Sequence, residues 1–185
     1  ALERMHANEM PWRATGDDSD AGLNRYPEPQ PRALLERLAR LYEVPPSRIL
    51  AGRGSDEAID LLVRAFCRAG EDRVVVCPPT FGYYSVAARI QGASVFEVPL
   101  DGADFALNVR AVVEAGRRSK LVFLCSPNNP TGQLFAEADI LEICESLAAN
   151  ALVVLDEAYI ELAARPSLAR RLTEFANLVV LRTLS

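Results

Sequence analysis

The sequence predicts an α/β fold, in which a doubly wound, mostly parallel sheet carries helices on both of its faces. Short apolar runs, such as residues 121–125 and 151–155, alternate along the chain with segments of helical periodicity. Runs without polar alternation are typical of strands that are buried on both faces, as in parallel sheets. Polar or small residues follow several of these runs. We therefore expect one ligand-binding edge, at the carboxyl ends of the strands.

Composition narrows the classes of function. The 185 residues suffice for about one domain, and half of them are hydrophobic. A net charge of −5 argues against a surface for nucleic acid. No apolar run approaches the roughly 20 residues of a membrane span, so no membrane partner is predicted. With a single histidine, His6, the chain predicts neither a zinc cluster nor any other metal site.

The chain has four cysteines, which lie in apolar runs and lack CxxC spacing: Cys67, Cys77, Cys125 and Cys144. Buried free thiols are typical of proteins in a reducing cytosol. The sequence therefore predicts a cytoplasmic protein with unpaired, buried cysteines.

Residues 1–30 are predicted to form an irregular N-terminal arm, because proline, glycine and acidic residues interrupt every periodic pattern there. Residues 31–185 are predicted to belong to one large domain. Pro31 suits the first turn of a helix that carries leucines at helical spacing and ends before Pro45. Residues 48–51 are expected to form a short strand.

The segment GRGSDE follows that expected strand and opens a helix that ends near Gly70. Ser55 is predicted as the N-cap, with Asp56 and Glu57 in the first turn. Backbone N–H groups at such a helix start can hold a phosphate, although a plain capped helix explains the same residues. The third glycine of the dinucleotide fingerprint is missing, so NAD is not predicted.

The next strand, residues 74–77, leads into PPTFGYY and then a helix that ends at Gly92. Tyr84 or Phe81 can stack on a flat cofactor at this strand end, and core packing is the alternative for each ring. A strand at residues 94–98 and a helix at residues 109–115 are expected to follow.

The central unit is a strand at residues 121–125, the loop SPNNPTG, a helix within residues 136–150, a strand at residues 151–155, and DEAY. Asn129 can bond a ligand oxygen or form an Asx turn before a proline. Asp156 ends a buried strand, where an unpaired charge is costly unless a cation or a hydrogen-bond donor meets it. Tyr159 can bond the same ligand or pack. A helix near residues 168–175 and a strand at residues 178–181 complete the pattern.

Several of these segments resemble one family. SPNNPTG, LDEAY and LRTLS resemble the fold-type I pyridoxal phosphate aminotransferases. More narrowly, HANEMPW, RYPEPQP, GRGSDEAIDLLVRAFC and PPTFGYYSVAARIQGA resemble the histidinol-phosphate aminotransferases. The resemblance runs along essentially the whole chain. It implies the N-terminal part of a pyridoxal phosphate-binding large domain, with pyridoxal 5'-phosphate as the cofactor.

The resemblance also implies roles around the cofactor ring. Asp156 matches the residue that keeps the pyridine nitrogen protonated, which makes the ring an electron sink. Asn129 and Tyr159 match residues that hydrogen-bond the phenolic oxygen. Tyr84 matches the ring that stacks on the pyridine face.

A second set of matched residues is implied to bind the cofactor phosphate. Gly54, Ser55 and Asp56 match the turn whose backbone grips it, and Ser185 matches a phosphate-binding serine. Tyr26, in RYPEPQP, matches a tyrosine that reaches the phosphate of the neighbouring subunit, which implies a homodimer.

The resemblance places a Schiff-base lysine directly after Ser185, where this chain ends. The one lysine present, Lys120, precedes a strand and is expected at the edge away from the site. No catalytic residue is therefore predicted within residues 1–185, and the 185 residues by themselves are expected to be inactive.

The implied activity is transamination of L-histidinol phosphate with 2-oxoglutarate, which yields glutamate, in histidine biosynthesis. Two alternatives stay open at this point. One is a related pyridoxal phosphate enzyme, such as an aromatic aminotransferase or a threonine-phosphate decarboxylase. The other is a non-catalytic domain that binds a ligand.

Overall fold

The computed structural model describes residues 8–13, 16, 18 and 22–184. The chain divides into two compact units, which we describe separately. The first comprises the described residues up to 41 together with residues 45–51, and the second comprises residues 42–44 and those from 52 onward. The predicted domain boundary at residue 30 stays a prediction.

The first unit contains the predicted leucine helix and a short 3₁₀ turn. Helix α1 spans Arg32–Tyr42 and begins directly after Pro31, and η1 spans Pro46–Arg48. The strand predicted at residues 48–51 is wrong, because these residues pair with no neighbouring strand. Instead, the side chain of Gln30 bonds both the N–H and the C=O of Ala51, at 2.8 and 2.9 Å. A side-chain amide thus satisfies the backbone that a sheet ladder would otherwise satisfy.

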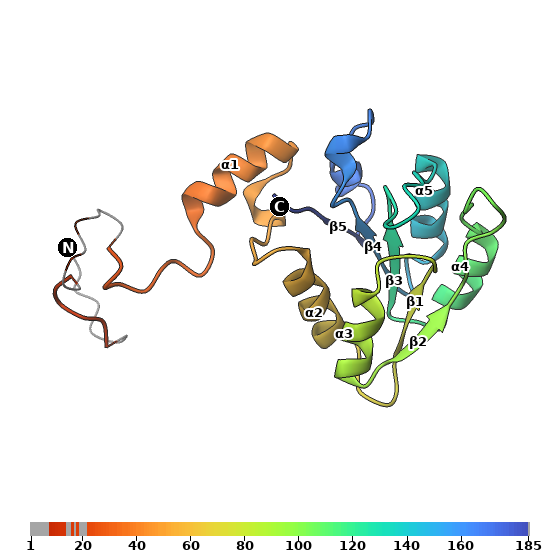
Figure 1. Ribbon diagram of the computed structural model, residues 1–185, viewed down its shortest axis with the longest axis horizontal. Coiled ribbons are helices and arrows are strands. Elements are labelled where there is room, and N and C mark those ends of the chain that lie inside the picture. Colours follow the sequence, from red (N-terminus) through yellow and green to blue (C-terminus); the bar gives the residue numbers. More distant parts are fainter. Residues whose placement is uncertain (1–7, 14–15, 17, 19–21, 185) are drawn as a thin grey trace. The chain divides into compact units, whose positions relative to one another are not determined.

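The second unit is built on a five-stranded parallel sheet with the order β2-β1-β3-β4-β5, as Figure 1 shows. Its strands are the apolar runs of the sequence: β1 Arg73–Val76, β2 Ser94–Glu97, β3 Leu121–Cys125, β4 Leu152–Asp156 and β5 Leu178–Leu181. The prediction of a parallel α/β sheet is therefore confirmed. The strands β3 and β5 have the predicted bounds, β1 and β4 are each displaced by one residue, and β2 ends one residue earlier than predicted.

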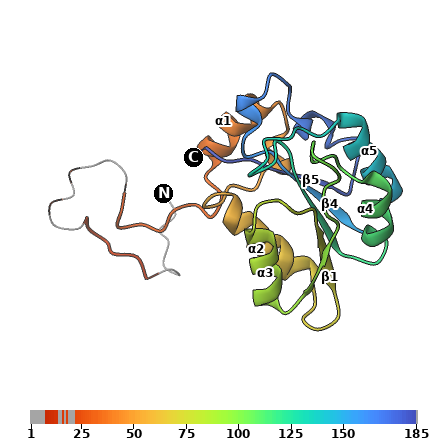
Figure 2. The ribbon, with the colours of Figure 1, turned by 45° about the vertical axis from the view of Figure 1, so that its right-hand side comes forward.

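Helices cover both faces of this sheet, so the prediction of a doubly wound fold is confirmed (Figures 1 and 2). The four α-helices of the unit are α2 Ser55–Phe66, α3 Tyr83–Gln91, α4 Val109–Gly116 and α5 Glu137–Ser146. Helices α2 and α3 pack on one face and α4 and α5 on the other. Alternate side chains of each strand enter opposite cores: Phe123 of β3 packs with α2 and α3, and Leu124 packs with α4 and α5.

Two details of the helices differ from the prediction. The helix expected at residues 168–175 is a 3₁₀ turn, η3, that spans only Leu168–Arg171. It is capped at its start by Ser167, whose hydroxyl accepts the N–H of Ala169 at 3.0 Å. Helix α2 ends at Phe66 and not near Gly70, whereas α3 ends as predicted at Gly92, which adopts a φ of 80°.

The four cysteines are buried and unpaired, as predicted. Burial raises the pKa of the Cys77 and Cys144 thiols to about 12, so both remain protonated and inert near neutral pH.

Within the described part of the chain, no helix has the length and apolarity needed to cross a membrane.

Candidate active site

The sheet reverses its direction of winding between β1 and β3, which are neighbours although β2 lies between them in the sequence. In open α/β sheets, ligands bind in the crevice outside the carboxyl ends of the strands at such a switch point. PPTFGYY follows β1 and SPNNPTG follows β3, on the two sides of this crevice. Asp156 ends the adjacent strand β4 and is the register partner of Cys125 in β3. Three of the predicted polar segments therefore meet at one edge.

Asn128 ties the first two of these segments together. Its side chain, 3 % exposed, donates to the carbonyl of Pro79 and to the hydroxyl of Thr131, each at 2.8 Å. Its amide oxygen accepts the hydroxyl of Thr80, also at 2.8 Å. The sequence does not single out Asn128, because an Asn before an Asn-Pro pair is typical of an ordinary turn. Its partners Thr80 and Pro79 lie 48 and 49 residues away, so no local pattern reveals these two contacts.

Asp156 is a buried carboxylate, with 2 % of the residue exposed. Its Oδ2 accepts the hydroxyl of Tyr84 at 2.7 Å, and its Oδ1 accepts the N–H of Ala158 at 3.1 Å. In the part of the chain that the structure describes, no arginine or lysine forms an ion pair with it. A carboxylate has about four lone-pair positions, so this one keeps acceptor capacity for a further, cationic donor.

Burial raises the pKa of the Asp156 carboxyl above its ordinary value. The hydrogen bonds from Tyr84 and Ala158 act against burial and lower this pKa, whereas the nearby charge of Asp56 raises it. A buried carboxylate whose ionised form is held mainly by two neutral donors is a strong acceptor for a cation. The protonated ring nitrogen of a heteroaromatic cofactor is such a cation.

This raised pKa predicts how stability depends on pH. The native state holds the proton of Asp156 more tightly than the unfolded state, so the contribution of this group is fully present below its ordinary pKa of 3.8. This contribution to stability is lost as the pH rises through the native-state pKa of Asp156, because the unfolded state releases the same proton at a lower pH. The stability of the wild type relative to Asp156→Asn is therefore expected to fall as pH rises from about 4.

Urea unfolding of both proteins without cofactor, across a pH series, measures this difference. A difference that is constant with pH, or that grows in favour of the wild type as pH rises, would contradict the prediction.

Tyr84 does not lie where a stacking ring is needed, which corrects the role expected for it. It is fully buried, and its ring stacks on Phe123 with centroids 4.8 Å apart and planes 9° apart. Phe81 meets it edge-on, with centroids 5.5 Å apart. No face of Tyr84 is left for a cofactor. Phe81, three residues earlier in the loop after β1, is half-buried and keeps exposed surface.

The start of helix α2 also differs from the prediction. Gly54, with a φ of 84°, is the N-cap, and Ser55 is the first helical residue. No side chain caps this end directly. Glu57 instead reaches back and accepts the N–H of Arg53 at 2.6 Å, while its other oxygen pairs with the Arg53 guanidinium at 2.8 Å. The N–H groups of the first turn, including those of Ser55 and Asp56, thus lie at a helix end without a side-chain cap, where a phosphate is favoured.

The other predicted site residues are placed as follows. Asn129 is half-buried in the loop after β3. Tyr159 follows β4 and is 44 % exposed. Tyr26 belongs to the first unit, is 66 % exposed, and is held through its N–H by Glu9 at 2.9 Å. Ser185 lies outside the described residues.

Lys120 directly precedes β3, at the amino end of the strand. The candidate site follows the carboxyl ends of the strands. A strand of five residues rises by about 3.3 Å per residue, so it separates Lys120 from the site by more than a lysine side chain spans.

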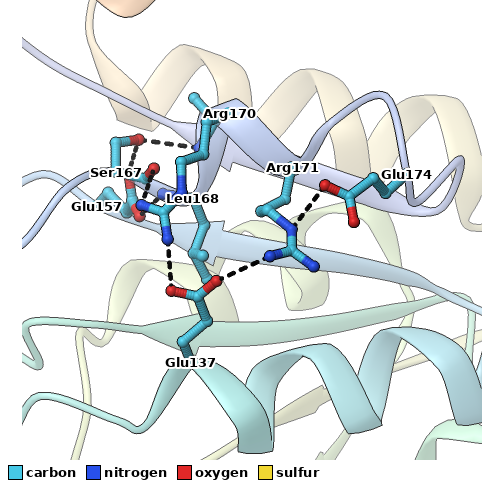
Figure 3. Close-up of polar contacts among 8 residues, drawn as sticks. Glu137, Glu157, Ser167, Leu168, Arg170, Arg171 and Glu174 are labelled. Atoms are coloured by element: carbon cyan, nitrogen blue, oxygen red, sulfur yellow. Dashed lines mark hydrogen bonds and ion pairs between the residues drawn. The ribbon is translucent and has the colours of Figure 1, made fainter.

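Glu157 is a second buried carboxylate, for which the sequence predicts no role. Because strand residues alternate, it points away from Asp156, to the face covered by α4 and α5. It accepts the N–H of Leu168 at 2.8 Å and the hydroxyl of Ser167 (Figure 3). The Arg182 guanidinium lies 3.8 Å away. Burial raises the pKa of Glu157. Its contacts anchor the segment between β4 and β5. The alternation of side chains along a strand is the sequence signal that predicts opposite directions for Asp156 and Glu157.

A small pocket lies next to Glu157, between α5 and the segment after β4, and is lined in part by Ser126, Phe135 and Arg165. It contains none of the residues predicted to bind a cofactor. Its lining residues Phe135, Ile140 and Leu155 belong to the core packed against α4 and α5.

Comparison with known proteins identifies relatives along the whole chain. Residues 7–185 match the model of the family described as aminotransferase class I and II. The chain is 53 % identical to histidinol-phosphate aminotransferase of Stenotrophomonas maltophilia and 51 % identical to that of Xylella fastidiosa, in each case over 98 % of this chain. The chain spans about half the length of these curated relatives.

Among solved structures, histidinol-phosphate aminotransferase from Sinorhizobium meliloti, in complex with pyridoxal-5'-phosphate, has a TM-score of 0.77 and 27 % identity. The superposition covers 87 % of this chain and 44 % of that one. The arrangement of the five strands and their helices is thus that of a fold-type I large domain.

Proposed function

The chain belongs to the class I and II aminotransferase family, and we propose that it acts in the transamination of L-histidinol phosphate with 2-oxoglutarate, with pyridoxal 5'-phosphate as cofactor. The identity of 53 % with a histidinol-phosphate aminotransferase supports this substrate over those of related enzymes. The single structural observation that carries the proposal is the buried Asp156, which has two neutral donors and capacity for a cationic one.

The residues of the candidate site fit this cofactor. Bound pyridoxal phosphate supplies an electron-withdrawing ring that stabilises negative charge at the reacting carbon. Asp156 would accept the N–H of the ring nitrogen and keep that nitrogen protonated, since a nearby carboxylate favours the cation. Asn129 and Tyr159 would donate to the phenolic oxygen. Phe81, in place of Tyr84, would cover the ring face, because it retains exposed surface at the end of β1.

The phosphate would be held at the start of α2. Backbone N–H groups of the turn at Gly54, Ser55 and Asp56 lie at the positive end of the helix dipole. Ser185, from the sequence resemblance, is proposed as a further phosphate ligand. Two copies of the chain are proposed to form a homodimer in which Tyr26 of one copy reaches the phosphate of the other. The four unpaired cysteines support a cytoplasmic location.

The function is tested by substrate preference. The intact gene product, supplied with pyridoxal phosphate and 2-oxoglutarate, is expected to form glutamate from L-histidinol phosphate. The specificity constant should exceed that for phenylalanine by about 100-fold or more, because a site built to bond a phosphate leaves its polar groups unpaired with a ligand that lacks one.

Other outcomes point to the alternatives. Comparable specificity constants for histidinol phosphate and phenylalanine would favour an aromatic aminotransferase. Release of carbon dioxide from threonine phosphate would favour a decarboxylase. Cofactor binding without turnover of any amine would favour a non-catalytic domain.

A further inference from the structure

Tyr84 has a hydroxyl that its packing alone does not require. The residue is fully buried in the core formed by α2, α3 and the sheet, where a phenylalanine would fill almost the same volume. Burying a hydroxyl is unfavourable unless it finds a partner. The partner here is Oδ2 of Asp156, 2.7 Å away and 72 residues later in the chain. The hydroxyl is thus retained at a position where it contacts the carboxylate of the candidate site.

The ring of Tyr84 is held on two sides, so its hydroxyl has little freedom to leave this position. Phe123 of β3 stacks on one face, and Phe81 meets the ring edge-on. The loop that leads into α3 is itself tied to the SPNNPTG loop by Asn128. Because its ring is held in place, the Tyr84 hydroxyl can fix the orientation of the Asp156 carboxylate that accepts its hydrogen bond. In metal sites, hydrogen bonds from surrounding residues orient the metal-bound histidines in the same way.

The hydroxyl can act only as a donor to this carboxylate. Burial raises the pKa of Tyr84, and the charge of Asp156 raises it further, so the phenol stays protonated. Tyr84 donates to one carboxylate oxygen, and the N–H of Ala158 donates to the other. The two donors together fix the plane of the carboxylate while each oxygen keeps a lone pair.

We propose that Tyr84 is a positioning residue for Asp156: its hydroxyl orients the carboxylate so that the remaining lone pairs stay available to the cationic N–H of the cofactor ring. The inference rests on the proposed function, since it requires a cofactor with a ring nitrogen. It replaces the stacking role that the sequence suggested for this tyrosine, and it places Tyr84 behind Asp156 and not against the cofactor.

The test compares two ligands that differ only at the ring nitrogen. Pyridoxal phosphate and its analogue with a C–H group in place of that nitrogen are bound to the intact gene product and to Tyr84→Phe, Tyr83→Phe and Asp156→Asn. Tyr84→Phe is expected to weaken binding of pyridoxal phosphate about tenfold, the effect of one hydrogen bond to a charged group, and to change binding of the analogue less than about twofold. Tyr83→Phe, the matched substitution one residue earlier in α3, should change neither affinity.

A second measurement needs no cofactor. The titration of the Asp156 carboxyl, followed by ¹³C NMR in the cofactor-free protein, is expected to move to higher pH in Tyr84→Phe and to stay unchanged in Tyr83→Phe. The groups that face this carboxyl are Tyr84 from α3, Cys125 from β3, Asp56 from α2 and the N–H of Ala158. Only the first is altered by the substitution.

The outcomes separate the inference from the proposed function. If Tyr84→Phe weakens both ligands equally, or neither, while Asp156→Asn weakens only pyridoxal phosphate, the inference is overturned and the function stands. If the wild type binds neither ligand, or Asp156→Asn fails to distinguish them, the proposed function falls and the inference falls with it.

Discussion

Asp156→Asn is expected to lower the kcat of transamination about 10³-fold or more in the intact gene product, which corresponds to about 4 kcal/mol of transition-state stabilisation. The carboxylate is the buried acceptor proposed for the cationic ring nitrogen. An amide in its place carries no charge and cannot keep that nitrogen protonated. The fold should survive, because an amide oxygen can still accept the hydroxyl of Tyr84, which lies 2.7 Å from Oδ2.

Steady-state kinetics with histidinol phosphate, together with circular dichroism of the same preparation, measures this effect. Asp104→Asn is the matched control, since Asp104 is exposed in the loop between β2 and α4. It should change kcat by less than about twofold, as surface substitutions away from special features do little. Near-normal turnover by Asp156→Asn would remove Asp156 from the site and with it the main structural support for the proposed cofactor.

Glu157→Ala is expected to destabilise the protein by about 2–4 kcal/mol, because each buried donor that loses its acceptor costs about 1–3 kcal/mol. The substitution leaves the buried N–H of Leu168 and the hydroxyl of Ser167 without their acceptor, and it removes a carboxylate from the neighbourhood of Arg182. The segment between β4 and β5 would lose its anchor, although no residue of the proposed cofactor site is touched.

Figure 3 shows the matched control, Glu137, which pairs with Arg170 and Arg171 at 2.6 and 3.3 Å but is 37 % exposed. Glu137→Ala is expected to cost about 1 kcal/mol or less, because exposed ion pairs contribute little. Urea unfolding at neutral pH compares the two variants. Equal destabilisation by both would mean that burial is not what gives Glu157 its importance.

The sequence alone determined the class of the fold and predicted the edge of the sheet at which the candidate site lies. Wholly apolar runs predicted the bounds of β3 and β5 to the residue, and β3 is buried along its whole length, as such runs indicate. Gly92 ended α3 where a positive φ was needed. The polar segments after β1, β3 and β4 had to meet at one edge, since parallel strands share their carboxyl ends.

Local patterns were wrong where a side chain other than the expected one satisfied the backbone. Ala51 looked like part of a strand, but the side chain of Gln30, 21 residues earlier, bonds both of its backbone groups. Ser55 looked like an N-cap, but Glu57 bonds the backbone of Arg53 and Gly54 takes the cap position. In both cases, the residue types are compatible with the predicted local structure as well as with the observed one.

Only the tertiary structure decided how the side chains of the candidate site divide their tasks. Tyr84 and Phe81 are both aromatic and lie three residues apart, so the sequence by itself predicts either of them as the ring that stacks on the cofactor. Helix α3 turns Tyr84 into the core against Phe123 and Asp156, while Phe81 keeps exposed surface. Propensity and periodicity depend only on residues that are close in the sequence. The role of the Tyr84 hydroxyl depends instead on Asp156, which is 72 residues later and reaches the hydroxyl only because helix α3 packs on the sheet.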